Sequence, residues 1–106
     1  MKVLRIEPGQ DPELIDIENK LESLQQQVGG YIECVTLIPG ELEMIVNEEG
    51  WLLDLPFNEL ASVLSRHNIA GTVIIAAVAG EEFAELDPKQ YNYIRRKVAQ
   101  WEWVNE

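Results

Sequence analysis

Carboxylates gathered in a short turn are the residues of this sequence that are best placed to do chemistry. Glu48 and Glu49 follow Asn47 in a turn, and Asp54 comes shortly after them. Such oxygens could hold a cation, or act together as an acid and a base. Either role needs a third ligand or a partner at short distance, and the sequence supplies neither. We therefore expect solvated turn acids, and we assign no catalytic residue and no metal site.

A second polar group follows a pair of glycines. Tyr31 and Glu33 come directly after the pair, where a helix is expected to pass into a strand. Gly29 stands where a residue after a helix adopts a left-handed conformation, which costs glycine little. The pair is therefore first a joint of the fold, although Tyr31 and Glu33 could also line a cleft. The candidate binding residues are those of the joint and of the acidic turn: Gly29, Gly30, Tyr31, Glu33, Asn47, Glu48 and Glu49.

The single cysteine and the single histidine are expected to be structural. Cys34 alternates with Ile32 and Thr36 along a strand, which predicts that its side chain faces the core. No basic neighbour in the sequence would lower its pKa, so we expect a buried and unreactive thiol. His67 stands at the end of a predicted helix, where a cation interacts favourably with the helix dipole. This inventory excludes a disulfide within the chain and a zinc site built on several cysteines, and we expect no cofactor.

The composition and charge of the chain limit the kinds of partner that it could bind. The 106 residues are 46% apolar and 25% charged, which is typical of one globular domain, here 1–106. The net charge is −11, and between Ile6 and Ser65 there are 13 acids against one base, Lys20. Such a chain disfavours nucleic acid and anionic membranes as partners, because both are bound by basic residues. The apolar run 69–80 is too short to span a bilayer and no signal peptide is evident, so we expect a cytoplasmic protein.

The elements that must position these residues follow from apolar spacing and turn residues. Strands are expected at 2–6, 31–38, 41–46, 51–55 and 70–80, the last being central because it is apolar on both faces. Helices are expected at 56–67 and from 88 to about 103, where Asp87 and Gln90 mark the start. The predicted fold class is α+β, a mainly antiparallel sheet of about five strands with two to three helices packed on it.

Residues 12–28 allow two interpretations. Apolar residues at helical spacing favour one helix over the whole stretch. The alternative is a strand at 13–17 followed by a helix at 20–28, for which Asn19 and Glu22 would form a capping box. We favour the second interpretation because apolar residues also alternate within 13–17.

The last predicted helix carries an apolar stripe and a basic cluster. The stripe consists of Tyr91, Ile94, Val98 and Trp101. The cluster 95–97 lies largely off that stripe, and we expect it to be solvated or to balance the acidic body rather than to bind nucleic acid. The segment 101–104 is apolar for a chain end, so it either covers the sheet or forms an exposed patch for a partner.

Several short stretches occur in an order that resembles a known family. They are EPG at 7–9, VGGYIE at 28–33, NEEG and LLDLPFN within 47–58, and IAGTVII at 69–75. Over roughly 3–85 the chain resembles the domain of unknown function 3846 family, small proteins of bacteria, their phages, plasmids and other mobile elements. The resemblance implies a prokaryotic cytoplasm and a mobile element, and it carries no catalytic residue or cofactor. A family-wide function would be expected at the motif residues Gly29, Gly30, Tyr31, Asn47, Glu48, Glu49, Gly50, Pro56, Asn58, Gly71 and Thr72.

Two functions from different classes remain. The favoured one is a non-enzymatic protein-interaction module of a mobile element, in the style of anti-defence proteins, whose acidic surface over 6–65 engages a protein partner. The alternative is a small-molecule or nucleotide-derivative binding domain with the joint 29–31 and the turn 47–50 as pocket rims. A deep pocket between the two segments would support the alternative, and a filled one would count against it. No titratable constellation supports an enzyme.

Overall fold

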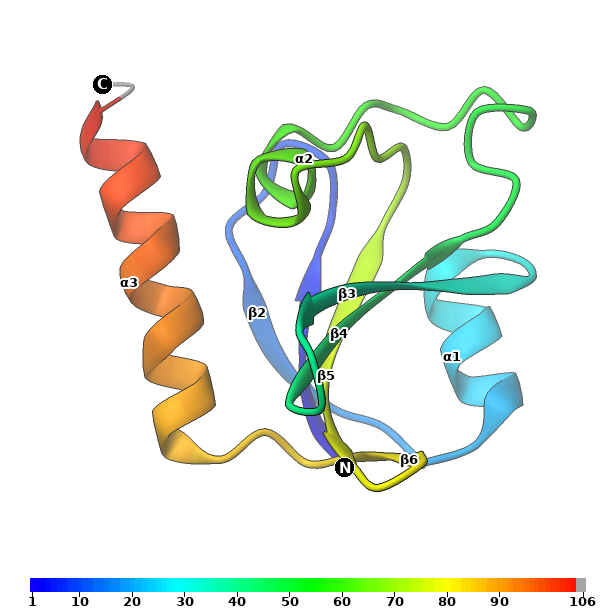
Figure 1. The fold of residues 1–106 in the computed structure, drawn as a ribbon. Helices are drawn as coiled ribbons and strands as arrows, with labels where there is room; N and C mark the ends of the chain where they lie inside the picture. Colours follow the sequence, from blue (N-terminus) through cyan, green and yellow to red (C-terminus); the bar gives the residue numbers. More distant parts are fainter. Residues whose placement is uncertain (105–106) are drawn as a thin grey trace.

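The computed structural model describes residues 1–104 and has an α+β fold, in which three helices cover a twisted antiparallel sheet (Figure 1). The strands are β1 (Lys2–Ile6), β2 (Glu13–Asp16), β3 (Ile32–Ile38), β4 (Leu42–Asn47), β5 (Val73–Ala79) and β6 (Glu82–Ala84). The helices are α1 (Leu21–Val28), α2 (Glu59–Ser65) and α3 (Pro88–Val104). The predicted fold class is confirmed. No helix within these residues is long and apolar enough to cross a membrane.

The sheet has the strand order β2-β1-β5-β4-β3, and the short β6 pairs with the end of β5. All neighbouring strands are antiparallel. Strand β5 lies in the middle, as its apolar composition predicts, and residues 73–77 are buried on both faces. This order leaves β2 at one edge of the sheet and β3 at the other.

Each face of the sheet supports its own core. The larger core lies under α2 and α3, where Leu60 packs with Ile94 and Val98 of the predicted α3 stripe. Tyr91 and Trp101 complete that stripe as partly buried side chains. The smaller core lies under α1, where Leu24 and Val28 pack against buried side chains of β1, β4 and β5. Successive side chains of each strand point to opposite faces of the sheet, so neighbouring residues contribute to different cores.

The structure resolves the ambiguity of residues 12–28 in favour of a strand followed by a helix. The predicted capping box of this helix is wrong, because α1 begins after Lys20 without a side-chain cap. The Asn19 side-chain amide donates instead to the Phe83 carbonyl at 2.9 Å. It therefore binds the β5–β6 hairpin and does not cap the helix. The box at the start of α3 does form, with the Gln90 N–H donating to Asp87 Oδ1 at 2.7 Å.

The strand predicted at 51–55 is absent, because this segment is a series of turns. The Leu53 N–H donates to the Glu49 carbonyl at 2.9 Å and the Leu55 N–H to the Gly50 carbonyl at 3.0 Å. These local bonds use backbone groups that a strand would have offered to the sheet. The segment therefore wraps past the end of the sheet and leaves Trp51, Leu52 and Leu53 exposed.

Helix α2 is shorter than predicted at both ends. It begins at Glu59 because Asn58 is its N-cap and accepts a hydrogen bond from the Ala61 N–H. It ends at Ser65 because Arg66 is left-handed, with φ at 61°. His67 therefore lies beyond the helix on the surface, and it does not occupy the last helical turn.

Candidate functional site

The glycine joint has the predicted geometry. Gly29 has φ at 80°, and the N–H groups of Gly29 and Gly30 donate to the Gln25 carbonyl at 2.8 and 3.1 Å. A Cβ atom at Gly30 would lie 3.0 Å from Asn47 Nδ2. The absence of a side chain at Gly30 thus allows the close approach of Asn47.

The joint and the acidic turn, which are remote in the sequence, meet in the structure. The buried Asn47 side chain donates to the Val28 carbonyl at 3.1 Å, and its Oδ1 accepts the Glu49 N–H at 2.7 Å. The Glu48 N–H donates to the Tyr31 carbonyl at 2.9 Å. Asn47 therefore occupies the space between the two segments and links them by hydrogen bonds.

The seven candidate binding residues do not form a single site. Glu33, Asn47 and Glu48 line one cavity, whereas Gly29 lines a separate hollow. Tyr31 is exposed and lines neither. Three of the seven candidates thus line one cavity and two are the glycines of the joint, while Tyr31 and Glu49 line neither hollow.

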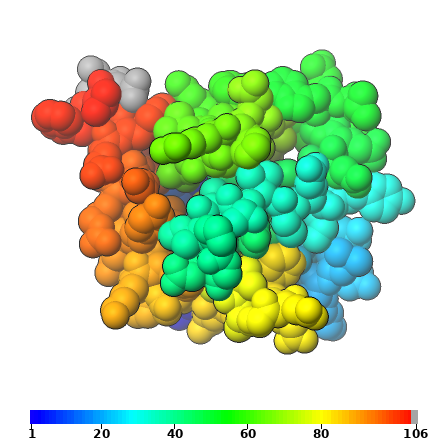
Figure 2. Space-filling view, in the orientation of Figure 1, coloured from blue at the N-terminus to red at the C-terminus, as the bar shows by residue number. Residues whose placement is uncertain are grey.

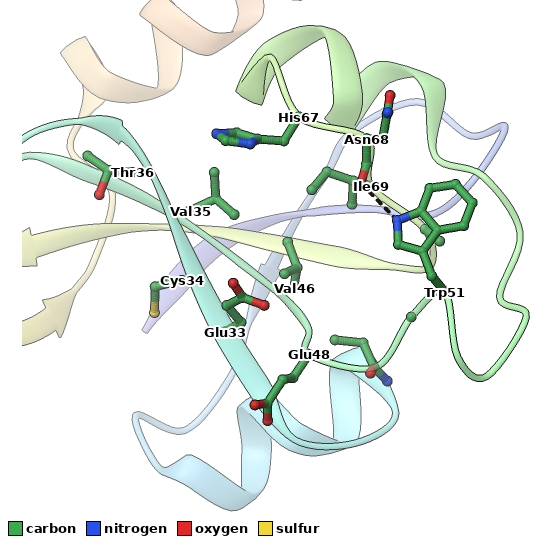
Figure 3. Close-up of a pocket in the computed structure, with 13 residues that line it drawn as sticks. Glu33, Cys34, Val35, Thr36, Val46, Glu48, Trp51, His67, Asn68 and Ile69 are labelled. Carbon is green, nitrogen blue, oxygen red and sulfur yellow. Dashed lines mark hydrogen bonds between the residues drawn. The ribbon is translucent and has the colours of Figure 1, made fainter.

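The cavity lined by Glu33 and Glu48 has a volume of about 360 Å³ (Figure 3). It lies between β3 and residues 67–70, and Trp51 stands at one end of it. In the close-up, His67 and Ile69 lie across the cavity from Val35, while Cys34 is on the opposite side of β3. His67 and Trp51 line the cavity but were not among the predicted binding residues. For Trp51, its position next to the acidic turn in the sequence was the one available signal, and for His67 there was none.

The wall of the cavity opposite β3 is held by contacts between two loops. Trp51 Nε1 donates to the Asn68 carbonyl at 3.0 Å, and its ring centroid lies 6.2 Å from that of Phe57. A Cβ atom at Gly50 would lie 2.7 Å from the Ala70 carbonyl oxygen, so the close packing of the loops requires glycine there. The exposed Trp51 ring is therefore held in place at the end of the cavity.

Asn58 anchors the same wall from inside the protein. Its side chain is 0% exposed and donates to the carbonyls of Ile6 and Gly71 at 3.0 and 2.9 Å. It also accepts the Ala61 N–H at 3.1 Å and so caps α2. Asn58 and Gly71, two of the motif residues, thus have a structural role here: they hold three segments of the chain together.

The expectation that Cys34 is buried in the core is wrong. Its side chain is exposed, and Val35 and Leu37 are the residues of β3 that pack against the larger core. Helix α1 covers the Cys34 face of the sheet mainly over β4 and β5, so the outermost strand β3 is left partly uncovered. Partial burial raises the pKa of the Cys34 thiol, and the carboxylates of Glu43 and Glu33 raise it further.

The acids of the predicted acidic surface fall into two groups. Most of those near β1 and β2 are paired: Arg5 lies 2.9 Å from Glu13, Lys20 lies 2.8 Å from Glu18, and the N-terminal ammonium lies 2.7 Å from Asp16. Asp11 and Glu22 form no ion pair within residues 1–104. From β3 to the start of α2, no acid forms an ion pair with another residue of 1–104. These unpaired acids are Glu33, Glu41, Glu43, Glu48, Glu49, Asp54 and Glu59.

The basic cluster of α3 forms no ion pair with this acidic region within residues 1–104. Residues 95–97 are exposed, and Lys97 Nζ lies 5.5 Å from the centre of the Tyr93 ring rather than against an acid. Trp101 packs against the larger core, whereas Trp103 and Val104 are exposed. The segment 101–104 therefore covers the core with Trp101 and exposes Trp103 and Val104.

Fold and site together define a small acidic α+β protein with a cavity beside one sheet edge. No group of three or more His, Cys, Asp or Glu side chains in the described part of the chain could hold a metal ion. The chain belongs to the family described as Domain of unknown function (DUF3846), whose model matches residues 1–99. This match confirms the resemblance and extends it into α3. The comparisons with curated proteins and with solved structures gave no match.

Proposed function

We propose that this protein is a non-enzymatic interaction module of a mobile element that binds a basic protein partner in the cytoplasm. The observation that carries the proposal is a surface that we call the acidic–apolar face. It consists of the unpaired acids and exposed apolar side chains between β4 and α2: Glu48, Glu49, Trp51, Leu52, Leu53, Asp54, Phe57 and Glu59.

The composition of this face resembles that of a protein interface. Leu52 is 84% exposed, and it lies between Trp51 and Leu53, which are more than half exposed. Exposed apolar side chains of this size, rimmed by charge, are typical of contact surfaces. Because the rim is acidic and lacks ion pairs, the fitting partner has an apolar pocket rimmed by Lys or Arg, as a nucleic-acid-binding groove of a host protein does.

A protein partner is favoured over the small-molecule alternative. The space between the joint and the acidic turn is filled by Asn47, which counts against a ligand pocket there. The three consecutive apolar side chains of the acidic–apolar face, Trp51, Leu52 and Leu53, are all more than half exposed, whereas a small-molecule site would enclose its ligand. Anti-defence activity is one form that such binding to host machinery would take.

The test compares two double charge reversals that change the net charge equally. Glu48→Lys with Glu49→Lys alters the acidic–apolar face, and Asp11→Lys with Glu22→Lys alters unpaired acids elsewhere. Partners are isolated from a bacterial host lysate at low and at high salt, and the association rate of each variant with the purified partner is then measured. We expect the first pair to slow association about tenfold and the control pair less than about twofold, because nearby charges steer encounter.

A third variant separates apolar contact from charge. Leu52→Ala removes an almost fully exposed side chain, so the fold should be unchanged while the complex dissociates faster. Circular dichroism and the melting temperature serve as fold controls for all variants. Binding that neither the reversals at Glu48 and Glu49 nor Leu52→Ala alters would exclude this face as the contact surface.

A further inference from the structure

Strand β3 presents unpaired backbone groups at the edge of the sheet. It pairs only with β4, with Glu33 opposite Val46 and Cys34 opposite Ile45. The Glu48 N–H donates to the Tyr31 carbonyl, so Glu33 and Val35 are the next residues of β3 that bond to β4, up to the register shift between Thr36 and Ile38. The N–H and C=O groups of the alternate residues 32, 34 and 36 therefore point away from β4. These groups form no hydrogen bond with another residue of 1–104.

This edge is bordered by two cavities of about 360 Å³ each. The first is lined by residues 33–36 of β3 and by residues 67–70 across from them. The second is lined by Thr36 and Leu37, with residues 63–66 and α3 across from them. The cavities meet at Thr36 and so follow the edge along most of β3, and Figure 2 shows the hollow between this strand and the segment that contains Trp51.

Cys34 lines the first cavity although its side chain lies on the other side of the strand (Figure 3). The Thr36 side chain also points to that side, where its hydroxyl donates to Glu43 Oε1 at 2.9 Å. These two residues therefore offer the cavity mainly their backbone, and in both the backbone groups are the ones that point away from β4. The edge is thus open to hydrogen bonding where the cavity lies.

The two ends of this groove have opposite charge. Glu33 and Glu48 line the end near the start of β3, and Arg66 and Lys97 line the end near Leu37. None of these four side chains forms an ion pair with another residue of 1–104. Between the ends the lining is mixed. Val35 and Ile69 in the first cavity and Val63 and Leu64 in the second are apolar, and polar residues such as His67 and Ser65 lie among them.

We propose that this groove binds an extended peptide segment of a protein partner, which adds to the free edge of β3 as a further strand. About five to seven residues fit a strand of this length, and main-chain hydrogen bonds to residues 32, 34 and 36 supply the affinity. Charge complementarity sets the orientation, with Lys or Arg beside Glu33 and Glu48, and Asp or Glu beside Arg66 and Lys97. The proposal extends the proposed function to a groove that shares Glu48 and Trp51 with the acidic–apolar face. Its test uses peptides and variants at Cys34, which is not part of that face, so either proposal can fail alone.

A second copy of this chain is the other possible occupant, and it is disfavoured. Helix α2 and residues 67–70 border the groove along the edge, so a second copy would have to bring its own sheet and helices against them. Sedimentation of the purified protein tests this directly. We expect a monomer, and a dimer that Cys34→Pro dissociates would overturn the peptide proposal.

The main experiment selects peptides from a random library of about seven residues on the full chain, and measures their affinity for two variants at Cys34. Cys34→Pro removes an N–H that points away from β4, so it blocks an added strand without breaking the β3–β4 ladder. Cys34→Ala is the matched control, because the side chain lies outside the groove. We expect selected peptides to carry opposite charges at their two ends, to bind Cys34→Pro at least about tenfold more weakly, and to bind Cys34→Ala as they bind the wild type.

A second measurement keeps the proposal testable if Cys34→Pro fails to fold. Peptides with N-methyl groups at alternate positions lose the donors that an added strand needs, and should bind at least about tenfold more weakly in one of the two alternating series only. Amide hydrogen exchange at Ile32, Cys34 and Thr36 should slow when the unmodified peptide is bound. No enrichment over an unrelated bait, or equal binding of all methylated peptides, would overturn the proposal.

Discussion

The two edges of the sheet differ in how they are protected against the addition of another strand. Strand β2 has four residues, two of which are the acids Glu13 and Asp16, and ion pairs with Arg5 and the N-terminal ammonium hold both acids. Strand β3 has seven residues with a single charge, Glu33. Natural sheets protect their edges with short strands and charges. By this criterion β2 is a protected edge and β3 is an open one.

The same contrast divides the acidic half of the chain. In the sequence, the run from Ile6 to Ser65 is evenly acidic, with only Lys20 to oppose it. In the structure, the acids near β2 have cations beside them, and the pKa of Asp16 is lowered chiefly by its hydrogen bond to the N-terminal ammonium. The acids from β3 to α2 have no such partner within residues 1–104. Net charge alone therefore overstates the acidic surface that is free to bind.

The largest loss of stability is expected from removing the Asn58 side chain, which anchors the segment across from the open edge. Asn58→Ala leaves the buried carbonyls of Ile6 and Gly71 without donors and removes the N-cap of α2. We expect a loss of about 2–4 kcal/mol in the free energy of unfolding, measured by urea denaturation. The exposed Asn92→Ala on α3 is the control and should change stability by less than about 0.5 kcal/mol. Equal stabilities would show that Asn58 does not hold the wall.

A smaller effect is expected at the joint that leads into the open edge. Gly29→Val places a β-branched residue at a φ of 80°, and should reduce the free energy of unfolding by about 1–2 kcal/mol or more. Gly29→Asn is the matched variant, because asparagine tolerates this conformation, and it should cost about half as much or less. An unchanged melting temperature of Gly29→Val would refute the role of this glycine as a joint.

The smallest effect is expected on the rate at which a reagent labels the Cys34 thiol on the open edge. Cys34 is exposed but its thiol pKa is raised, so at pH 7–8, below the ordinary pKa of about 9, less thiolate is present than in the unfolded chain. A small thiol reagent should therefore label the native protein to completion but more slowly than the urea-unfolded protein. The difference should shrink as the pH rises above the raised pKa, because both thiols are then ionised. A native protein that resists the reagent completely at high pH would show that Cys34 is inaccessible after all.

Local features of the sequence were sufficient for most of the elements. Gly29 ends α1 as predicted, Asp87 and Gln90 begin α3, and the run around Val73–Ala79 forms the central strand. Each of these outcomes depends on residues a few positions apart, whose turn chemistry or apolar period is decided within one element. The family match over residues 1–99 confirms the resemblance that was drawn from similarly short motifs.

The errors arose where a side chain found a partner far away in the sequence. Asn19 was expected to cap α1, but it donates to the carbonyl of Phe83, which is 64 residues distant. The turns of segment 51–55 are built by local hydrogen bonds, to which Gly50, Trp51 and Leu55 add contacts with residues 68–71. No local pattern reports such partners.

What the sequence determined by itself was the fold class, the glycine joint and the excess of acid, because these follow from composition and from short-range rules. Tertiary structure alone decided which face of β3 is buried, since alternation separates Cys34 from Val35 but cannot say which of the two a helix will cover. It also decided which distant segments the side chains of Asn47 and Asn58 connect, and that unpaired acids lie beside an open edge. Those outcomes depend on which strands lie at the edge and which loops meet there, and the order of strands in a sheet is a property of the whole chain.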